Sequence, residues 1–240
     1  MTSVAMIFAA GRGERMRPLT DTCPKPLLEA GGKPLIVWQI ESLARAGFTT
    51  IVVNHAWLGE QFEPALGDGS RWGVTLRYSA ERDALETAGG IAKALPLLEP
   101  DGKPVAFVAI AGDLFTDFNY ASLRPHAARL AHAPAPGMHL VMVSNPPFHP
   151  RGDFALRDDG TLTLDASLPR QTFGSIGVYD TRMFRSIAPG TARKLAPYFA
   201  ETITAGRATG QHFDGLWHNV GTPAELADVD TRLRISPPLR

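Results

Sequence analysis

The sequence contains little cysteine, no long apolar run and no excess of either charge. One cysteine, Cys23, stands among 240 residues, so an internal disulfide is excluded and a reducing compartment fits. No apolar stretch approaches the ~20 residues that a helix needs to span a bilayer, and no basic region precedes the short apolar run at the N-terminus. Lys+Arg and Asp+Glu number 24 each, whereas generic nucleic-acid binders are usually basic. We therefore expect a cytoplasmic protein that binds neither membranes nor nucleic acid.

A glycine-containing loop follows the first apolar run, residues 4–8, which is typical of a buried strand. The loop, residues 9–26, has the sequence AAGRGERMRPLTDTCPKP. Gly11 and Gly13 allow the backbone to turn sharply and to approach a ligand closely. Lys25 lies between two prolines, which hold the lysine on a stiff, extended segment. Exposed N–H groups, guanidiniums and a positioned ammonium suit a polyphosphate. The arginines of the loop are Arg12, Arg15 and Arg17.

The loop matches neither of two familiar phosphate-binding motifs. A dinucleotide fingerprint requires a third glycine where this chain has Met16, and the P-loop sequence Gly-Lys-Ser/Thr does not occur here. A glycine-rich surface turn flanked by solvated arginines is the alternative interpretation. The whole string, AAGxGxRMxPLT followed by PKP, resembles the signature of the sugar-1-phosphate nucleotidyltransferases, which join a nucleoside triphosphate to a sugar phosphate.

Apolar periodicity predicts strands that alternate with helices, and this order favours a mostly parallel sheet with helices on both faces. Strands are expected at 4–8, 49–54, 74–78, 105–110, 139–143 and 171–179, a hairpin at 154–164, and helices at 35–46, 59–66, 89–98, 120–131, 181–187, 194–205 and 223–233. The resemblance implies a Rossmann-like, three-layer α/β fold of the GT-A type with a small β-hairpin region. We expect one domain over 1–240, in which 1–132 mainly bind nucleotide and 133–240, where prolines gather, mainly bind sugar.

An aspartate, Asp113, comes directly after the apolar strand at 105–110. A carboxylate at the carboxyl end of a parallel strand lies where open α/β sheets bind ligands, and it can hold Mg²⁺ against phosphate oxygens. The alternative is an aspartate that caps a turn. The resemblance assigns the metal to this Gly-Asp pair and to a second acid in a W-x-D-x-G-T segment. Here the segment reads WHNVGTP, so the second ligand would be the uncharged Asn219, whose alternative is an ordinary turn asparagine.

The segment ERDALETAGG, residues 81–90, enters a predicted helix. The resemblance places a turn of this kind against the base and ribose, which makes Glu86, Thr87 and Gly89 candidate nucleotide contacts. By spacing, Glu81 falls where relatives carry a glutamine that reads the base. A carboxylate there would accept the N3–H of uracil. A solvated loop acid is the alternative for Glu81.

Further candidates lie at the end of the second strand and in the second half of the chain. Asn54 and His55 end that strand, and either substrate binding or turn formation and packing would account for them. In the proline-rich loop at 145–154, an arginine could grip a carboxylate with two parallel hydrogen bonds, although a solvated arginine is equally expected. The candidate sugar-side residues are Asn54, His55, Asn145, Arg151, Asp153, Gly174 and Lys194.

Three further strings, NHAWLG, LETAGG and NPPFHPRGDF, narrow the resemblance to the branch of the family that acts on N-acetylmuramate 1-phosphate in cell-wall recycling. The implied reaction takes UTP and this sugar phosphate to UDP-N-acetylmuramate and pyrophosphate. There are three alternatives. The protein could use another sugar 1-phosphate (glucose, mannose or N-acetylglucosamine), it could be a weakly active nucleotide-sugar-binding module, or it could be a nicotinamide oxidoreductase, which Met16 disfavours. The sequence leaves the oligomeric state open, with a monomer allowed.

The resemblance also implies individual roles. Arg15 would stabilise the leaving pyrophosphate, Lys25 would bridge the two reacting phosphates, and Asp113 with Asn219 would hold Mg²⁺. Gly11, Gly13 and Glu14 would form the backbone cradle, and Ala10 and Ala111 would also contact the nucleotide.

Overall fold

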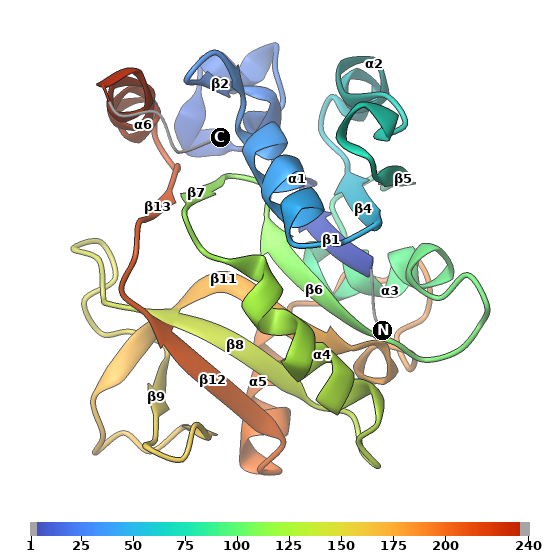
Figure 1. Ribbon diagram of the computed structural model, residues 1–240, viewed down its shortest axis with the longest axis vertical. Helices are drawn as coiled ribbons and strands as arrows, with labels where there is room; N and C mark the ends of the chain where they lie inside the picture. Colours follow the sequence, from blue (N-terminus) through green and yellow to red (C-terminus); the bar gives the residue numbers. More distant parts are fainter. Residues whose placement is uncertain (1–3, 236–240) are drawn as a thin grey trace.

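A nine-stranded sheet forms the centre of the computed structural model, which describes residues 4–235 (Figure 1). Its main strands lie in the order β5-β4-β1-β6-β11-β8-β12, and the hairpin β9-β10 extends from the start of β11. All main strands except β11 point the same way, because β11 is antiparallel to both β6 and β8. The mostly parallel sheet is therefore confirmed. The strands are β1 (Val4–Phe8), β4 (Thr50–His55), β5 (Thr75–Ala80), β6 (Ala106–Ala111), β8 (Met138–Val143), β9 (Phe154–Leu156), β10 (Leu162–Thr163), β11 (Arg170–Asp180) and β12 (Ala208–Phe213).

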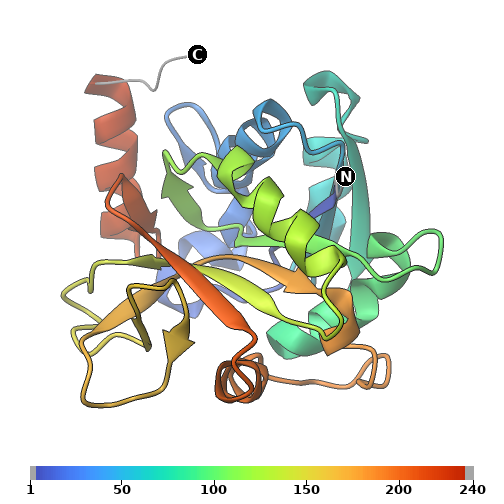
Figure 2. The ribbon, with the colours of Figure 1, turned by 60° about the horizontal axis from the view of Figure 1, so that its bottom comes forward.

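Helices cover both faces of the sheet and complete three layers. α1 (Leu35–Arg45), α2 (Phe62–Leu66) and α4 (Arg124–Ala131) pack on one face, and α3 (Glu86–Leu98) and α5 (Ala196–Thr204) pack on the other. Figure 2 shows α4 and α5 on opposite sides of the sheet. Strand β1 shows why both faces are covered. Its alternate side chains point to opposite faces of the sheet and are buried in two separate apolar cores. Within residues 4–235, no helix has the length and apolar character that crossing a bilayer requires.

Most predicted elements are present, with differences at their ends. The hairpin is confirmed, whereas α3 begins at Glu86, three residues earlier than expected. The helix expected at 181–187 is reduced to the single 3₁₀ turn Thr181–Met183. Strand β12 was not predicted, because its sequence ATGQHF lacks an apolar run; pairing with the buried β8 makes it a strand.

A third, smaller core anchors the glycine-containing loop to the end of the chain. α6 (Pro223–Ile235) brings Val229 and Leu233 against Met16, which is fully buried. The carboxylate of Asp230 on α6 accepts a hydrogen bond from the N–H of Gly31 at 2.8 Å. The loop and the segment after it are therefore held by residues from the C-terminal helix. Four short strands complete this region: β2 (Glu29–Ala30), β3 (Lys33–Pro34), β7 (Leu114–Thr116) and β13 (Trp217–Asn219).

Two histidines stack between α4 and the edge of the sheet. The ring centroids of His126 and His139 are 3.6 Å apart. In the buried His139, Nδ1 lies 2.9 Å from Thr209 Oγ1 and Nε2 lies 3.1 Å from Gln211 Oε1. Because an amide oxygen only accepts, Nε2 carries the proton and Nδ1 accepts from the hydroxyl, as in a neutral imidazole. Burial, reinforced by the nearby charges of His126 and Arg129, lowers the pKa of His139 to about 4.

Acid is expected to destabilise the fold through His139. In the unfolded chain the imidazole titrates near its ordinary value of 6.5, so between that pH and about 4 the unfolded chain binds a proton that the folded chain excludes. The free energy of unfolding therefore falls as the pH falls through this range, by about 3 kcal/mol in total. Urea unfolding of the wild type and of His139→Gln at several pH values measures the effect. Equally steep pH dependence in both proteins would contradict the assignment.

Candidate functional site

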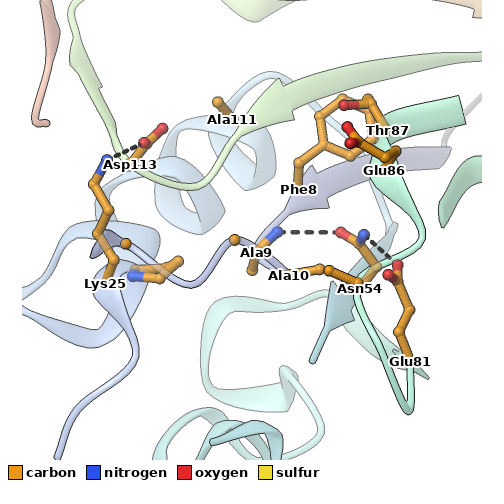
Figure 3. Close-up of a pocket in the computed structure, with 14 residues that line it drawn as sticks. Phe8, Ala9, Ala10, Lys25, Asn54, Glu81, Glu86, Thr87, Ala111 and Asp113 are labelled. Atoms are coloured by element: carbon orange, nitrogen blue, oxygen red, sulfur yellow. Dashed lines mark hydrogen bonds and ion pairs between the residues drawn. The ribbon is translucent and has the colours of Figure 1, made fainter. Parts of the chain in front are cut away.

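The site lies where the order of the strands reverses. From β1 the chain runs outward to β4 and β5, and it then returns to β6 on the other side of β1. Open α/β sheets bind ligands at the carboxyl ends of the strands at such a switch point. A cavity of about 470 Å³ occupies this position, and we call it the switch-point pocket (Figure 3). Its lining residues are Phe8, Ala9, Ala10, Gly11, Gly13, Lys25, Pro26, Asn54, Glu81, Ala84, Glu86, Thr87, Ala111 and Asp113.

The buried side chain of Asn54, near the end of β4, joins the segments that follow β1 and β5 at one end of the pocket. Its Oδ1 accepts the N–H of Ala9 at 3.1 Å, and its Nδ2 donates to Glu81 Oε1 at 2.7 Å, as Figure 3 shows. The other oxygen of Glu81 accepts the N–H of Leu85, the residue before α3, at 2.8 Å. Glu81 is 5% exposed and both its oxygens are engaged, so the structure makes it a residue that positions the loops.

Two glycines of α3 permit close approaches. A Cβ at Gly90 would lie 2.7 Å from Glu81 Oε1 and 2.9 Å from Asn54 Nδ2. A Cβ at Gly89 would lie 2.3 Å from the carbonyl oxygen of Thr191. The same loop caps the start of α3, because the carbonyl oxygen of Arg193 accepts the N–H groups of Ala88 and Gly89. Gly89 was predicted to contact nucleotide. It does not line the switch-point pocket, and the contact found for it is with this loop.

The other end of the pocket holds the predicted lysine and aspartate. Lys25 begins a 3₁₀ turn, Lys25–Leu27, and its ammonium forms an ion pair with the carboxylate of Asp113, as Figure 3 shows. Gly13 has a left-handed φ of 69° and packs against the stem of Lys25, with a Cβ position 3.1 Å from the lysine Cβ. A Cβ at Gly11 would meet no atom within 4 Å, so the backbone there is open toward the cavity. This end suits phosphate oxygens.

The three arginines of the loop differ in their contacts. Arg12 stacks on Trp57 at 3.7 Å and pairs with Asp21, which Arg17 also contacts. These two guanidiniums lower the pKa of Asp21, Arg12 having the larger effect, and hold the loop together. Arg15 is exposed, and no described residue forms an ion pair with it. Its guanidinium lies near Gly221, where an added Cβ would come within 2.9 Å of Arg15 Nη2. Arg15 and the predicted cradle residue Glu14 do not line the pocket.

Several predicted sugar-side residues lie outside the switch-point pocket. His55 is half-buried and stacks on Phe62 with ring centroids 5.5 Å apart, and its partial burial lowers its pKa, so its contacts are packing contacts. Lys194 lines a separate cavity near α5. Arg151 is exposed on the proline-rich loop.

Polar contacts organise the proline-rich loop from within. The Asn145 amide donates to the carbonyl oxygens of Pro150 and Arg170, and its oxygen accepts from the Thr172 hydroxyl at 2.8 Å. Asp153 accepts the N–H of Phe173 at 2.8 Å. The carbonyl of Gly174 accepts from the Trp217 indole at 2.9 Å. These residues shape the loop and the strand beside it.

The predicted metal ligands are joined through the backbone. Val220 N–H donates to the carbonyl of Asp113 at 3.0 Å, which sets Asn219 opposite Leu114. Asn219 lines a second cavity of about 570 Å³ with the proline-rich loop, and Asp113 lines the switch-point pocket. Within 4–235 no group of three or more His, Cys, Asp or Glu residues could hold a metal. One carboxylate and one amide fit a hard cation only when ligand phosphates and water complete its shell.

Reasoning from the sequence missed four pocket residues: Phe8, Ala9, Pro26 and Ala84. Phe8 ends β1 and pairs in register with Ala111 and Asn54, both of which had been selected. A signal was available, because residues at the ends of adjacent parallel strands meet at one edge of the sheet. Ala84 lies inside the selected segment 81–90, but it has no polar side chain that would have distinguished it from its neighbours.

A phosphate-suited loop, a facing carboxylate and a three-layer sheet with a switch point define a nucleotide-binding α/β protein. The sequence profile of the nucleotidyl transferase family matches residues 4–146. The chain belongs to this family. An N-acetylmuramate alpha-1-phosphate uridylyltransferase of Neisseria meningitidis serogroup B is 49% identical over 94% of this chain and 96% of its own length. A relative of the same name from Caulobacter vibrioides is 32% identical, with 96% of both chains covered.

Other relatives carry different names. A mannose-1-phosphate guanyltransferase of Schizosaccharomyces pombe is 36% identical over 92% of this chain and 61% of its own length. Among solved structures, one from Bacillus anthracis, assigned to the glucose-1-phosphate thymidylyltransferases, superposes with a TM-score of 0.79 at 20% identity over 99% of this chain and 98% of that chain. HddC from Yersinia pseudotuberculosis superposes with a TM-score of 0.74 at 16% identity, over 96% of this chain and 99% of that chain. These structures confirm the predicted fold.

Gly90→Ala is expected to destabilise the protein and weaken nucleotide binding. An alanine inside a helix is ordinarily favoured over glycine by about 1 kcal/mol, but here its methyl group would push apart the buried Glu81 and Asn54. Overpacking of this kind lowers the free energy of unfolding by about 1–3 kcal/mol. Denaturant unfolding and nucleotide titration measure both effects, with Lys93→Ala on the same helix as control. A more stable Gly90→Ala protein would show that the pair is not tightly held.

Proposed function

We propose that this protein transfers UMP from UTP to N-acetylmuramate 1-phosphate, releasing pyrophosphate. The near full-length similarity to the Neisseria relative carries the proposal. The switch-point pocket supports it, because one end offers an ammonium and open backbone for a triphosphate, and the other end offers acceptors for a base and ribose. Such a reaction serves the recycling of cell-wall sugars.

In the proposed reaction, a phosphate oxygen of the sugar attacks the α-phosphorus of UTP in line. A new phosphorus–oxygen bond forms, the bond to the β-phosphate bridging oxygen breaks, and pyrophosphate leaves with that electron pair. The protein contributes mainly positioning and charge neutralisation. Lys25 exchanges its partner Asp113 for the reacting phosphates, and its partly buried position strengthens that interaction. Arg15, which faces solvent beside Gly221, receives the departing pyrophosphate.

The proposal includes Mg²⁺ bound together with the triphosphate. Asp113 would hold it, with Asn219 as an uncharged second ligand, and it would supply neutralisation of phosphate charge. Because Asp113 is paired with Lys25 in the free protein, nucleotide phosphates would have to engage the Lys25 ammonium before the Asp113 carboxylate could hold the metal.

The two halves of the chain divide the substrates in this proposal. All residues of the switch-point pocket lie between 8 and 113, which supports nucleotide binding by residues 1–132. Residues 133–240 would then hold the sugar through the loop of Asn145, Arg151 and Asp153, with Gly174 beside it. The exposed Arg151 is the proposed partner for the lactyl carboxylate, which N-acetylglucosamine lacks.

A second candidate is the same chemistry on another sugar phosphate or base. The similarity to mannose-1-phosphate guanyltransferases favours it, although those matches are lower in identity than the Neisseria one. A weakly active nucleotide-sugar-binding module is the remaining alternative, and it rests on the uncharged Asn219 alone.

Pyrophosphate release is the measurement that tests the proposal. With UTP and Mg²⁺, turnover is expected with N-acetylmuramate 1-phosphate and is expected to be at least tenfold slower with glucose, mannose or N-acetylglucosamine 1-phosphate, since a polar group built to pair with a missing partner rejects the analogue. GTP with mannose 1-phosphate serves as the competing pair. Faster turnover with that pair would replace the proposed substrates, and no turnover with any pair would favour the binding module.

Lys25→Ala is expected to lower kcat on the order of a hundredfold, with a smaller effect on KM for UTP, because the ammonium acts on charge that concentrates in the transition state. Asp113→Asn is expected to remove most turnover and to weaken the dependence on Mg²⁺. Lys33→Ala is the control, since Lys33 pairs with Glu41 outside the pocket. A change confined to KM would reduce Lys25 to a binding residue.

A further inference from the structure

A buried amide on α1 contacts the backbone of β7. Gln39 is 2% exposed and lies on the face of α1 that carries the buried Leu35 and Leu43, four positions away on either side. Its Nε2 donates to the carbonyl oxygen of Leu114, the first residue of β7, at 2.6 Å. A polar side chain in apolar surroundings is costly unless its hydrogen bonds are made, so this amide depends on its partners.

A second partner fixes the direction in which the amide points. The hydroxyl of Tyr120, a residue that is 1% exposed, hydrogen-bonds to Gln39 Oε1. Burial raises the pKa of Tyr120, so the phenol keeps its proton and acts as the donor. The carbonyl of Leu114 can only accept, so the NH₂ group faces it and the amide oxygen faces the tyrosine. The three groups therefore form a relay with a single hydrogen-bonding arrangement.

Strand β7 needs this amide because it has a strand partner on one side only. It pairs with β13, and just beyond the pairing the carbonyl of Asp113 accepts the N–H of Val220 at 3.0 Å. Successive carbonyl groups of a strand point to opposite sides, so the Leu114 carbonyl points away from β13. α1 lies beside β7 there, as Figure 1 shows, and Gln39 supplies the donor that a third strand would have supplied.

Three successive residues, 112–114, are each held by a different element. The N–H of Gly112 donates to the carbonyl of Phe8 in β1 at 2.8 Å, and an added Cβ would lie 2.9 Å from that oxygen. The carbonyl of Asp113 is held by the segment after β13, and that of Leu114 by α1. Between these anchors, the Asp113 carboxylate lines the switch-point pocket and pairs with Lys25 (Figure 3). The direction of the carboxylate therefore depends on all three anchors.

We propose that Gln39, which does not itself line the pocket, is a positioning residue for Asp113. It acts through the Leu114 carbonyl and fixes the turn, so that the carboxylate points at the end of the pocket suited to phosphates. The inference rests on the proposed nucleotidyl transfer, in which Asp113 acts on phosphate charge. Small displacements of a group that meets the transition state cost more in rate than in substrate binding, so the amide contributes to kcat from outside the pocket.

Gln39→Met and Tyr120→Phe separate positioning from stability. Methionine resembles glutamine in shape but has no donor, so in Gln39→Met kcat is expected to fall on the order of tenfold, with KM for UTP changed about twofold. Tyr120→Phe interrupts the relay but keeps the bond to Leu114, and its kcat is expected to stay within about twofold of the wild type. Both variants leave buried polar groups unpaired, so both are expected to unfold at a lower temperature. A loss of kcat in Tyr120→Phe as large as in Gln39→Met would overturn the inference.

The double variant Gln39→Met/Tyr120→Phe keeps the inference testable where Gln39→Met folds poorly. It removes the tyrosine hydroxyl that the single variant leaves unpaired, so it is expected to unfold at a higher temperature than Gln39→Met. Its kcat is expected to stay low, because the Leu114 carbonyl still lacks its donor. Recovery of kcat together with stability would assign Gln39 to the fold alone and overturn the inference.

Combination with Asp113→Asn tests whether the amide acts through Asp113. Adding Gln39→Met to Asp113→Asn is expected to cause little further loss of the residual kcat, since the carboxylate that Gln39 positions is already gone. Multiplying losses would show that Gln39 acts elsewhere and would overturn the inference.

Calorimetric titration of UTP with Mg²⁺ present repeats this cycle without a sugar phosphate. Each single variant is expected to weaken binding on the order of threefold, and the pair no more than either one. This result would support the inference even when no sugar phosphate is turned over. Turnover by the wild type, together with losses that multiply in the pair, would overturn the inference and leave the proposed reaction standing.

Discussion

The amide of Asn54 is the contact on which the site depends. At the carboxyl ends of β1, β4 and β5, a single side chain of β4 links the segments that follow β1 and β5 through Ala9 and Glu81. Glu81 carries the link to the start of α3 through Leu85. An unpaired partner in this buried network would cost about 1–3 kcal/mol. The network therefore holds both walls of the pocket at a set separation before any ligand binds.

The glycine-containing loop is held by contacts outside the pocket, which leaves its own backbone open to ligand. The carbonyl of Thr20 accepts from Arg12 and from the Trp57 indole, and its hydroxyl donates to the carbonyl of Gly13. Met16 is buried against α6, from the other end of the chain. A loop ordered in this way loses little further entropy on binding, so the proposed interaction of its backbone and Lys25 with phosphates would be retained as affinity and catalysis.

Local patterns predicted the secondary structure of the first half of the chain well and that of the second half less well. Apolar runs located β1, β4 and β6, because strands buried on both faces consist of continuous hydrophobic residues. β12, made of half-exposed polar residues, became a strand only through pairing with β8. His55 follows Asn54 directly and was grouped with it. Successive strand residues face opposite sides of a sheet, so one entered the pocket wall and the other packed on Phe62.

The sequence by itself determined the strand-then-loop signature, the family, and the choice of Lys25 and the strand-end Asp113 as candidate residues, because these depend on residue type and on short spacings. The tertiary structure added that Lys25 and Asp113 form an ion pair. Only the tertiary structure decided which acid is free to meet a ligand. Glu81 and Glu86 are five positions apart, yet Glu81 is enclosed by Asn54 and Leu85, and Glu86, at the start of α3, has a left-handed backbone and lines the cavity. The tertiary structure also explained Gly89 and Gly90, since their missing side chains matter only where distant segments press against α3.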